Sequence, residues 1–379
     1  MSSFEYQNSS PPGPRVETSL NVASDVEGRA GDIGLSNKAR KRRWARKLRL
    51  AFTARLPKRP YAITMFQARI EPAIFDPEDL QGLRARINAE TGGHYSAFRN
   101  NLSADHRRVM RDIVRGYVAL AAIICATGTI GLLAIPLGAV LIGFTVAYLQ
   151  LFIHEGAHYG LAADRKSNDR IANIFICWQV GTEIGSYRTT HWQHHRALGG
   201  PGDTEVSYRN PLRLGFIAAM LTGVHALRVF LSRGNAPVKD KAKASRGPLL
   251  RGVAVHAVFL AALIVAGWWP AAIAWIGGMA VFFPFFATVR QLLEHRPAGG
   301  EGGQLAVTRL FGDGIVERIF GGAGFNRHML HHLEPQISYT RLRDLEAYLM
   351  TTSASTELDA RRSTYMRAFG ELIRSDRRG

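Results

Sequence analysis

The chain has 379 residues, enough for one large domain or two small ones. Its mean hydropathy of −0.05 would suit a soluble protein, and its formal net charge is +18, but the charged and apolar residues are segregated along the sequence. The two cysteines, Cys125 and Cys177, are too few for a disulfide framework, and they exclude a four-cysteine zinc or iron–sulfur site formed by this chain alone.

The N-terminal segment is polar and then strongly basic. Residues 1–35 are rich in Ser, Gly, Pro and Asn, a composition typical of disorder, with no apolar core of a secretory signal peptide. Residues 38–59 contain eleven Lys and Arg and no acidic residue. This run either lies on an anionic membrane surface or is a solvated tail. A basic run can also bind nucleic acid, but the apolar segments downstream argue against that function. We assign residues 1–60 to a disordered basic tail.

Two short helices are predicted before the first apolar segment. Asp76-Pro77 has the form of a helix N-cap followed by proline in the first turn, so a helix is expected from Pro77 to Ala89. A second, amphipathic helix is expected from Asp105 to Arg115. Residues 61–116 are therefore expected to form cytoplasmic helices that precede the membrane.

Two long segments contain no Asp, Glu, Lys or Arg: residues 117–153 and 252–289. Each is about twice the ~20 apolar residues that cross a bilayer as a helix. A proline interrupts each near its middle, Pro136 in the first and Pro270 in the second. We therefore predict four transmembrane helices in two hairpins, over 117–134, 136–153, 252–268 and 270–293. A buried helix pair in a soluble protein is the alternative, and uncharged runs of this length argue against it.

Charge predicts the orientation of these helices. The loops at Pro136 and at Pro270 are short and uncharged, whereas the N-terminus, residues 154–250 and the C-terminus carry the basic residues. Basic residues remain on the cytoplasmic side of a membrane. The expected fold is an all-α integral membrane protein with both termini and a helical cap in the cytoplasm. Residues 117–340 would form the membrane and catalytic domain, and 341–379 a cytoplasmic tail with a helix near Arg341 to Met350.

Eight of the thirteen histidines fall in three compact clusters, which we call the histidine boxes. Residues three or four apart share a helical face, so an HxxxH pair directs two imidazoles at one point. An HxxHH triplet directs its first and third imidazoles at one point and its middle one at a neighbouring point. Eight neutral imidazoles are too many for one tetrahedral zinc but suit two metal ions, and imidazole binds iron as well as zinc. The boxes are His154 and His158; His191, His194 and His195; and His328, His331 and His332.

A ninth histidine, His295, directly follows the fourth predicted transmembrane helix. By the charge-based orientation it lies on the same membrane face as all three boxes, and the cap would carry one shared site there.

The order of these boxes resembles the membrane fatty-acid desaturases and their relatives, the hydroxylases, epoxygenases and carotenoid ketolases. The resemblance covers about residues 114–340, through the segments HEGAHYG, HWQHHRALGG and NRHMLHHLEP. It implies an O₂-dependent lipid oxidoreductase with two iron ions held by the eight boxed histidines. It also implies that an acyl chain extends towards the irons, and it includes His295 less directly because that residue lies outside the boxes. Asn326 would contact the site directly or through water.

Carboxylates lie beside the boxes. Glu155 and Glu294 each adjoin a histidine, and Asp203 and Glu205 follow the second box. Carboxylates in such places orient metal-binding imidazoles by accepting their second N–H, or they serve as ordinary caps and ion-pair partners. The sequence leaves both roles open.

Two other classes of protein share part of this pattern. His154-Glu155-Gly156-Ala157-His158 also fits HExxH, the signature of zinc metalloproteases, including intramembrane ones. That assignment needs a further ligand, typically an Asp in a later apolar segment, and leaves six clustered histidines unexplained. A metal transporter would need polar ligands within the membrane helices, where His256 stands alone.

Fatty acyl desaturation is the leading expectation, with lipid hydroxylation or carotenoid ketolation on the same scaffold as the alternatives. The substrate would be a lipid with a long hydrocarbon chain in contact with membrane lipids, and nucleic acid is not expected as a partner. Because the sequence shows no cysteine cluster or dinucleotide-binding motif, a separate ferredoxin or cytochrome b5-like protein would deliver the electrons. The basic cytoplasmic face suits an acidic donor of that kind. Substrate identity and the choice between these reactions cannot be read from the sequence.

Overall fold

The structure is a computed structural model that describes residues 79–200, 202–233, 246–296 and 304–375. The chain divides into two units, Met1–Arg69 and Ile70–Gly379, and every described residue belongs to the second. The predictions for the 1–60 tail and for the Asp76-Pro77 cap therefore lie outside the described residues.

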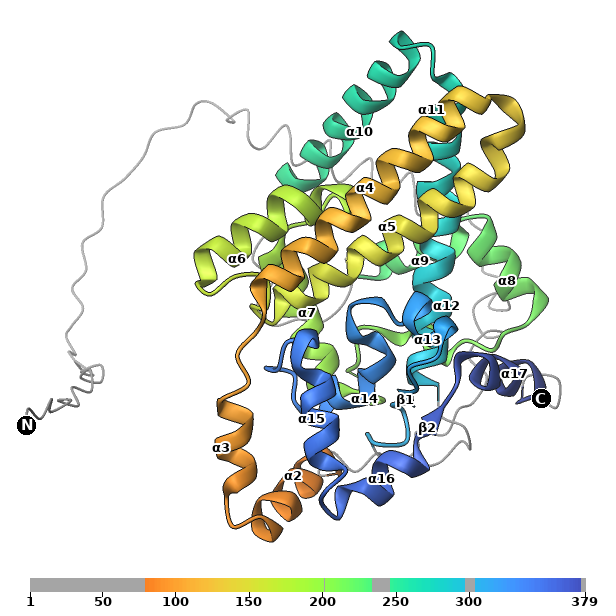
Figure 1. Cartoon of the computed structure of the whole chain (residues 1–379). Helices are drawn as coiled ribbons and strands as arrows, with labels where there is room; N and C mark the ends of the chain where they lie inside the picture. Colours follow the sequence, from red (N-terminus) through yellow and green to blue (C-terminus); the bar gives the residue numbers. More distant parts are fainter. Residues whose placement is uncertain (1–78, 201, 234–245, 297–303, 376–379) are drawn as a thin grey trace, which may run out of the picture. The chain divides into compact units, whose positions relative to one another are not determined.

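The described residues are mostly helical (Figure 1). The elements that form the membrane part and carry the first two boxes are α4 (His106–Ile130), α5 (Ile135–Ala157), α7 (Ile184–Ala197), α10 (Gly247–Val265), α11 (Trp269–Gly277) and α12 (Phe283–His295). The other helices are α2 (Asp79–Glu90), α3 (His94–Asn100), α6 (Arg165–Ile171), α8 (Leu214–Leu221), α9 (Val224–Arg233), α13 (Ile315–Phe320), α14 (His328–Leu333), α15 (Leu342–Leu349), α16 (Ala354–Ala360) and α17 (Tyr365–Ser375).

Short irregular helical segments and one small sheet connect them. The segments are η1 (Leu132–Ala134), η2 (Ala172–Ile176), η3 (Cys177–Val180), η4 (Val206–Arg209), η5 (Gly278–Phe282), η6 (Gly322–Arg327) and η7 (Tyr339–Arg341). Strands β1 (Leu310–Phe311) and β2 (Arg362–Ser363) pair in parallel, with Leu310 opposite Arg362. This pairing brings the chain before α17 beside the segment that precedes α13.

Four helices are long and apolar enough to span a membrane, as predicted: His106–Ile130, Leu132–Ala157, Gly247–Val265 and Trp269–His295. Many of their apolar side chains are exposed; Leu133 is 92% and Val265 is 89% exposed. Because so large an exposed apolar surface is unfavourable in water, these helices suit a lipid environment.

The first membrane helix is longer at its N-terminus than predicted. Residues 105–115 and the first span form one continuous helix, α4, which Asp105 caps by accepting from the backbone N–H of Arg108 at 3.0 Å. The change from charged to apolar residues near 117 marks the start of the apolar segment, but it does not break the helix. α4 ends at Ile130, earlier than the predicted residue 134, because Gly131 adopts a φ of 88° that only glycine favours.

Prolines shape the ends and middle of the membrane helices. Pro136 lies in the first turn of α5, where its missing N–H costs no helical hydrogen bond. In the fourth span, Pro284 lies in the first turn of α12, just after the π-helical segment η5, and this irregular turn accommodates the hydrogen bond that proline cannot donate. At this point α5 packs very closely, since a Cβ atom on Gly143 would lie 2.4 Å from the Cβ atom of Phe282.

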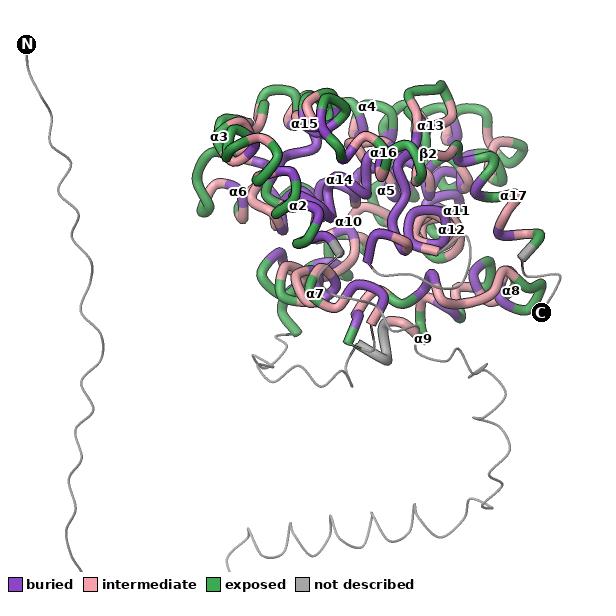
Figure 2. The backbone as a smooth tube through the Cα atoms, turned by 90° about the horizontal axis from the view of Figure 1, so that it is seen from below, coloured by how far each residue is buried: buried purple, intermediate pink, exposed green. Residues whose placement is uncertain are grey.

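The apolar core positions the histidine-bearing helices. One cluster joins α2 and α3 to α4, α5, α14 and α15, and a second joins α4, α5 and α11. A third cluster joins α8, α12 and α17. Figure 2 shows buried backbone around α14 and α5. The C-terminal ends of α5 and α12 meet α14, which carries the third box.

Candidate metal centre

Four elements bring the nine histidines together. His154 lies in the last turn of α5, and His158 directly follows that helix. All three histidines of the second box lie on α7, as their spacing predicts, and the third box forms most of α14. His295 is the last residue of α12. Seven of the nine are buried, and the remaining two, His158 and His195, are partly buried.

An arginine on α7 aligns the first two boxes. The side chain of Arg188 donates from Nε to the carbonyl of Ala157 at 3.0 Å and from Nη2 to that of Gly156 at 3.1 Å. These carbonyls lie at the C-terminal end of α5, where the helix no longer supplies the usual partners, and that of Gly156 also accepts from the Tyr159 backbone N–H and the Asn168 amide. Arg188 also stacks on Tyr159, 3.9 Å from the ring centroid, where the chain turns with a φ of 61°. Because Arg188 precedes His191 by one helical turn, it fixes α7 against the first box.

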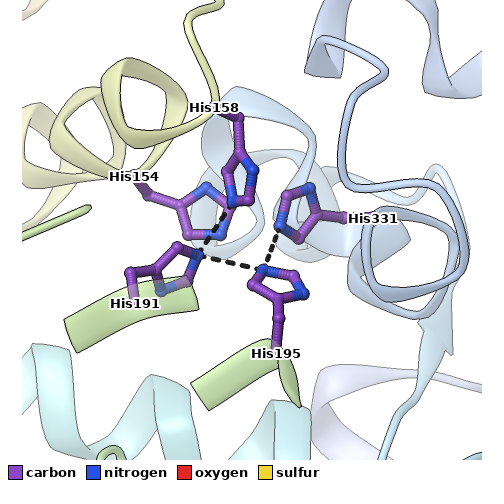
Figure 3. A group of neighbouring side chains, drawn as sticks. All are labelled: His154, His158, His191, His195 and His331. Atoms are coloured by element: carbon purple, nitrogen blue, oxygen red, sulfur yellow. Dashed lines mark hydrogen bonds between the residues drawn. The ribbon is translucent and has the colours of Figure 1, made fainter. Parts of the chain in front are cut away.

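Five imidazoles form one compact group, which we call the five-histidine group (Figure 3). One nitrogen from each residue lies within 4.8 Å of all the others. The Nε2 atom of His191 lies 3.0 Å from that of His158 and 3.1 Å from that of His195. The Nε2 atom of His195 is in turn 3.0 Å from that of His331. The members are His154, His158, His191, His195 and His331.

The other four imidazoles form a second group, the four-histidine group. Nitrogens of His194, His295 and His332 lie within 4.8 Å of one another. His328 joins them, because its Nε2 atom is 2.8 Å from that of His295 and 3.1 Å from that of His332. The two groups are adjacent, with the ring centroids of His195 and His332 4.4 Å apart.

The HxxHH boxes divide between the two groups as helical spacing predicts. His191 and His195, first and third in the second box, share the five-histidine group, and His194 between them reaches the other. In the third box the first and third members, His328 and His332, belong to the four-histidine group, whereas His331 reaches the other. Each HxxHH box therefore contributes to two neighbouring points, whereas His154 and His158 of the first box both join the five-histidine group.

Hydrogen bonds to the outer nitrogens set the tautomers of three imidazoles. The Nδ1 atom of His191 lies 2.9 Å from a Glu205 carboxylate oxygen, and that of His194 lies 2.7 Å from Asp203. His295 places its Nδ1 atom 3.1 Å from the carbonyl oxygen of Val307. Because a carbonyl or carboxylate oxygen only accepts, each Nδ1 carries the proton and each Nε2 presents a lone pair to its group.

The inward nitrogens fit metal cations. The Nε2 atoms of His154 and His194 are buried with no hydrogen-bond partner. Burial first, and then neighbouring imidazoles, lower the pKa of His158, His195 and His331 well below the ordinary value, which favours the neutral form that binds metals. Burial alone would lower the pKa of His194, but the carboxylates of Glu205 and Asp203 raise it above its ordinary value.

The candidate residues beside the boxes differ in whether their side chains contact a histidine. Asp203 accepts from His194 and from the Tyr208 hydroxyl at 2.7 Å each. Glu155 instead lies against the backbone N–H of Tyr339, at 3.5 Å, and Glu294 pairs with Arg290. The Asn326 amide donates to the carbonyl of Gly312 and to Asp313. Of the five predicted contacts Glu155, Glu294, Asn326, Asp203 and Glu205, the two that hydrogen-bond a histidine among the described residues are Asp203 and Glu205.

Sequence reasoning did not find three parts of the site: Arg188, Tyr208 and the Val307 carbonyl. A backbone carbonyl carries no signature in the sequence, so Val307 could not have been found. Arg188 has a weak signal, one helical turn before the second box. His256, which lies outside the boxes, has partners of its own: it lies 3.1 Å from the Gln179 carbonyl and accepts from the indole N–H of Trp275.

A comparison with protein families gives a match to this chain. The family model described as fatty acid desaturase matches residues 130–361, which is more than half of the chain and spans all three boxes and His295. No curated protein matches the chain at a significant level. The chain has four helices able to span a membrane and two histidine groups near the C-terminal ends of α5 and α12. Together with the matched segment, these features show that the chain belongs to the fatty acid desaturase family.

Proposed function

We propose that this protein is a membrane-bound di-iron oxidoreductase that uses O₂ to insert a double bond into the hydrocarbon chain of a lipid. One observation carries the proposal: nine imidazoles gather into two adjacent groups, one of five and one of four. Family membership supports an oxidoreductase that acts on lipids. The number of irons, the dependence on O₂ and the desaturation itself are the parts proposed here.

The five-histidine group would hold one iron and the four-histidine group the other. Neutral imidazole suits iron, and the Nε2 atoms turned inward are the donors that such ions need. Bound iron would supply the capacity to activate O₂ and so to oxidise an unactivated C–H bond. Inserting a double bond takes one hydrogen from each of two neighbouring carbons. The four electrons that reduce O₂ to two waters come in equal parts from these C–H bonds and from an external donor.

The chain's own residues would orient and shield this centre. Glu205, Asp203 and the Val307 carbonyl hold three imidazoles by their outer N–H groups, which keeps the inner lone pairs in place. Phe325 covers the centre on one side, with its ring 4.7 Å from that of His154 and 5.1 Å from that of His328. An apolar cover of this kind excludes water from the reacting carbon.

We also propose that the four membrane helices form two hairpins with both termini and the histidine boxes in the cytoplasm. The excess of Lys and Arg outside the spans supports this orientation. A separate ferredoxin or cytochrome b5-like protein with an acidic surface would then supply electrons from the cytoplasm, steered by the basic face.

Hydroxylation, or ketolation of a carotenoid, remains the second candidate, because the same centre can serve it. A zinc protease based on HExxH has less support. Its general base would be Glu155, whose carboxylate faces Tyr339 and the turn at 338–340, while His154 and His158 meet three further imidazoles instead of one ligand.

Metal analysis and lipid mass spectrometry test the proposal together. The purified chain should contain about two irons, and membranes that express it should contain a lipid that has lost two hydrogen atoms. A lipid that gains one oxygen atom would identify a hydroxylase. One zinc and no iron would contradict the di-iron centre and favour the protease.

A further inference from the structure

A small apolar pocket lies beside the metal centre, between α5, α12, α13 and α17. Its volume is about 30 Å³, enough for one small polar group or a water molecule. Aromatic rings form much of its wall: Phe144 meets Phe286 at 5.2 Å and Phe320 at 5.5 Å between centroids. Phe320 is 41% exposed, and its lining neighbour Ile319 is 51% exposed. The pocket therefore reaches the surface on a side lined with apolar groups, where a lipid chain can enter.

One polar atom in this apolar pocket has no partner, and an ion pair lies beside it. The hydroxyl of Tyr365 is buried, with the residue only 3% exposed, and it makes no hydrogen bond. Arg290 also lines the pocket, and its Nε atom forms an ion pair with an oxygen of Glu294 at 3.3 Å, although neither atom makes a hydrogen bond. Buried polar atoms in native proteins almost always have hydrogen-bond partners, so the Tyr365 hydroxyl beside this ion pair indicates a missing polar group.

Arg290 lies close to the candidate metal centre, with the ring of Phe325 as their common neighbour. The guanidinium of Arg290 lies over the ring of Phe325, 4.3 Å from its centroid. The same ring lies 4.7 Å from that of His154 in the five-histidine group and 5.1 Å from that of His328 in the four-histidine group. A ligand group held by Arg290 would therefore lie beside an aromatic ring that contacts both histidine groups.

The donors and acceptors define the class of group that fits. Arg290 can only donate, Glu294 accepts, and Tyr365 can do either. Burial holds the pKa of Tyr365 well above its ordinary range, so its hydroxyl keeps its proton. A hydroxyl group on a ligand donates to Glu294 while it accepts from Arg290 or Tyr365. A methylene group can do neither, and a carboxylate has no proton to donate.

We propose that this pocket binds a hydroxyl group carried on the hydrocarbon chain of the lipid substrate, and that Tyr365 determines the preference for it. This inference rests on the proposed lipid oxidation, and it goes further by naming the substrate class as hydroxylated lipids. Arg290 and Glu294 hold the same hydroxyl beside the ring of Phe325, which contacts both histidine groups.

Photoaffinity labelling of the full-length, iron-loaded protein in detergent tests the proposal. The probes are a long-chain alcohol with a diazirine on its chain and the matched alkane with the same diazirine. One satisfied buried hydrogen bond should favour the alcohol by about tenfold in labelling of peptides from α5, α12, α13 or α17. Equal labelling by the two probes, or labelling confined to other segments, would overturn the proposal, and neither result requires a variant.

Tyr365→Phe sharpens the test, because it removes the hydroxyl and keeps the ring that stacks on Phe311 at 4.0 Å. The preference for the alcohol should fall several-fold, while labelling by the alkane stays the same. Tyr348→Phe is the matched control, since the Tyr348 ring stacks on Phe98 and does not line the pocket. An unchanged preference in Tyr365→Phe would mean that water alone satisfies these atoms. Iron content of each sample separates this outcome from failure of the metal centre, because labelling needs no turnover.

Discussion

The two histidine groups are built from overlapping elements but are supported unequally. In the five-histidine group the anionic partner is Glu205, whose side chain is 12% exposed and also accepts from Gln291. In the four-histidine group the partner is Asp203, whose side chain is fully buried. Asp203 accepts from His194, from Tyr208 and from the backbone N–H groups of Gly199 and Glu205.

This difference shows which group is held more rigidly. A buried carboxylate with four donors has little freedom to move, whereas a partly exposed one is screened and can adjust. We therefore expect His194 to be fixed more strictly than His191, and the four-histidine group to tolerate change less well. The following experiments probe that difference, in order of decreasing effect.

The largest effect is expected for His194→Ala, which removes an imidazole from the four-histidine group. Product formation should fall by more than the ~10–100-fold that follows loss of a supporting partner. The membrane helices should remain folded, because apolar packing holds them. Iron content, monodispersity in detergent and product are measured together. His225→Ala is the control, since His225 contacts Ser207 and neither histidine group. Full iron loading with normal turnover in His194→Ala would remove the second box from the site.

A smaller and unequal effect is expected when the two supporting carboxylates are neutralised. Asp203→Asn should lower iron affinity or activity by about 10–100-fold, and Glu205→Gln by less. The reason is that Asp203 is fully buried, so an amide there cannot accept from all four donors. Iron affinity is measured by competition with a chelator. If Glu205→Gln were the more damaging change, the four-histidine group would not be the more rigid one.

The two groups share one membrane face in the proposed topology, which a pair of inserted tags can test. A reporter after Gly200 and another after Gly300 should be accessible from the same side, the cytoplasm. Protease protection of sealed vesicles gives the answer for each tag separately. Opposite sides would mean that one hairpin is assigned incorrectly, and the two histidine groups could not then assemble as described.

The smallest effect is expected from deleting residues 1–60, which precede every residue of both groups. A chain that starts at Tyr61 should bind the same amount of iron and retain turnover. Membrane fractionation of the same cells shows whether targeting is intact. A targeted, iron-loaded protein without turnover would show that the tail takes part in the reaction.

Much of the candidate metal centre could be predicted, because its histidines are arranged by short-range spacing. Helical periodicity alone places His191 and His195 together and turns His194 to the neighbouring point. Asp203 and Glu205 were identified as candidates because they lie just past the second box. Glu155 and Glu294 show where adjacency misleads: each is next to a histidine in sequence, yet their side chains face Tyr339 and Arg290. Successive residues on a helix point in different directions, so a neighbour in sequence is rarely a partner.

The remaining features depend on contacts between distant segments. Tyr365 reaches the pocket beside α12 only because α17 packs against α12 and α13, and no local pattern in the tail indicates this. The continuous α4 helix was missed for a different reason, since the boundary was placed where charge ends and not where helix-breaking residues occur. Asp105 caps the start of that helix and Gly131 ends it, whereas the change in hydropathy at 117 falls within it.

The interleaving of the two groups on the same helices has a thermodynamic consequence for assembly. α7 carries His191 and His195 for one group and His194 for the other, and α14 divides its histidines in the same way. An ion bound by either group would order both helices, so the second ion would meet ligands whose conformational entropy is already lost. Loading should consequently be positively cooperative, with a sigmoidal titration and few chains that hold a single ion.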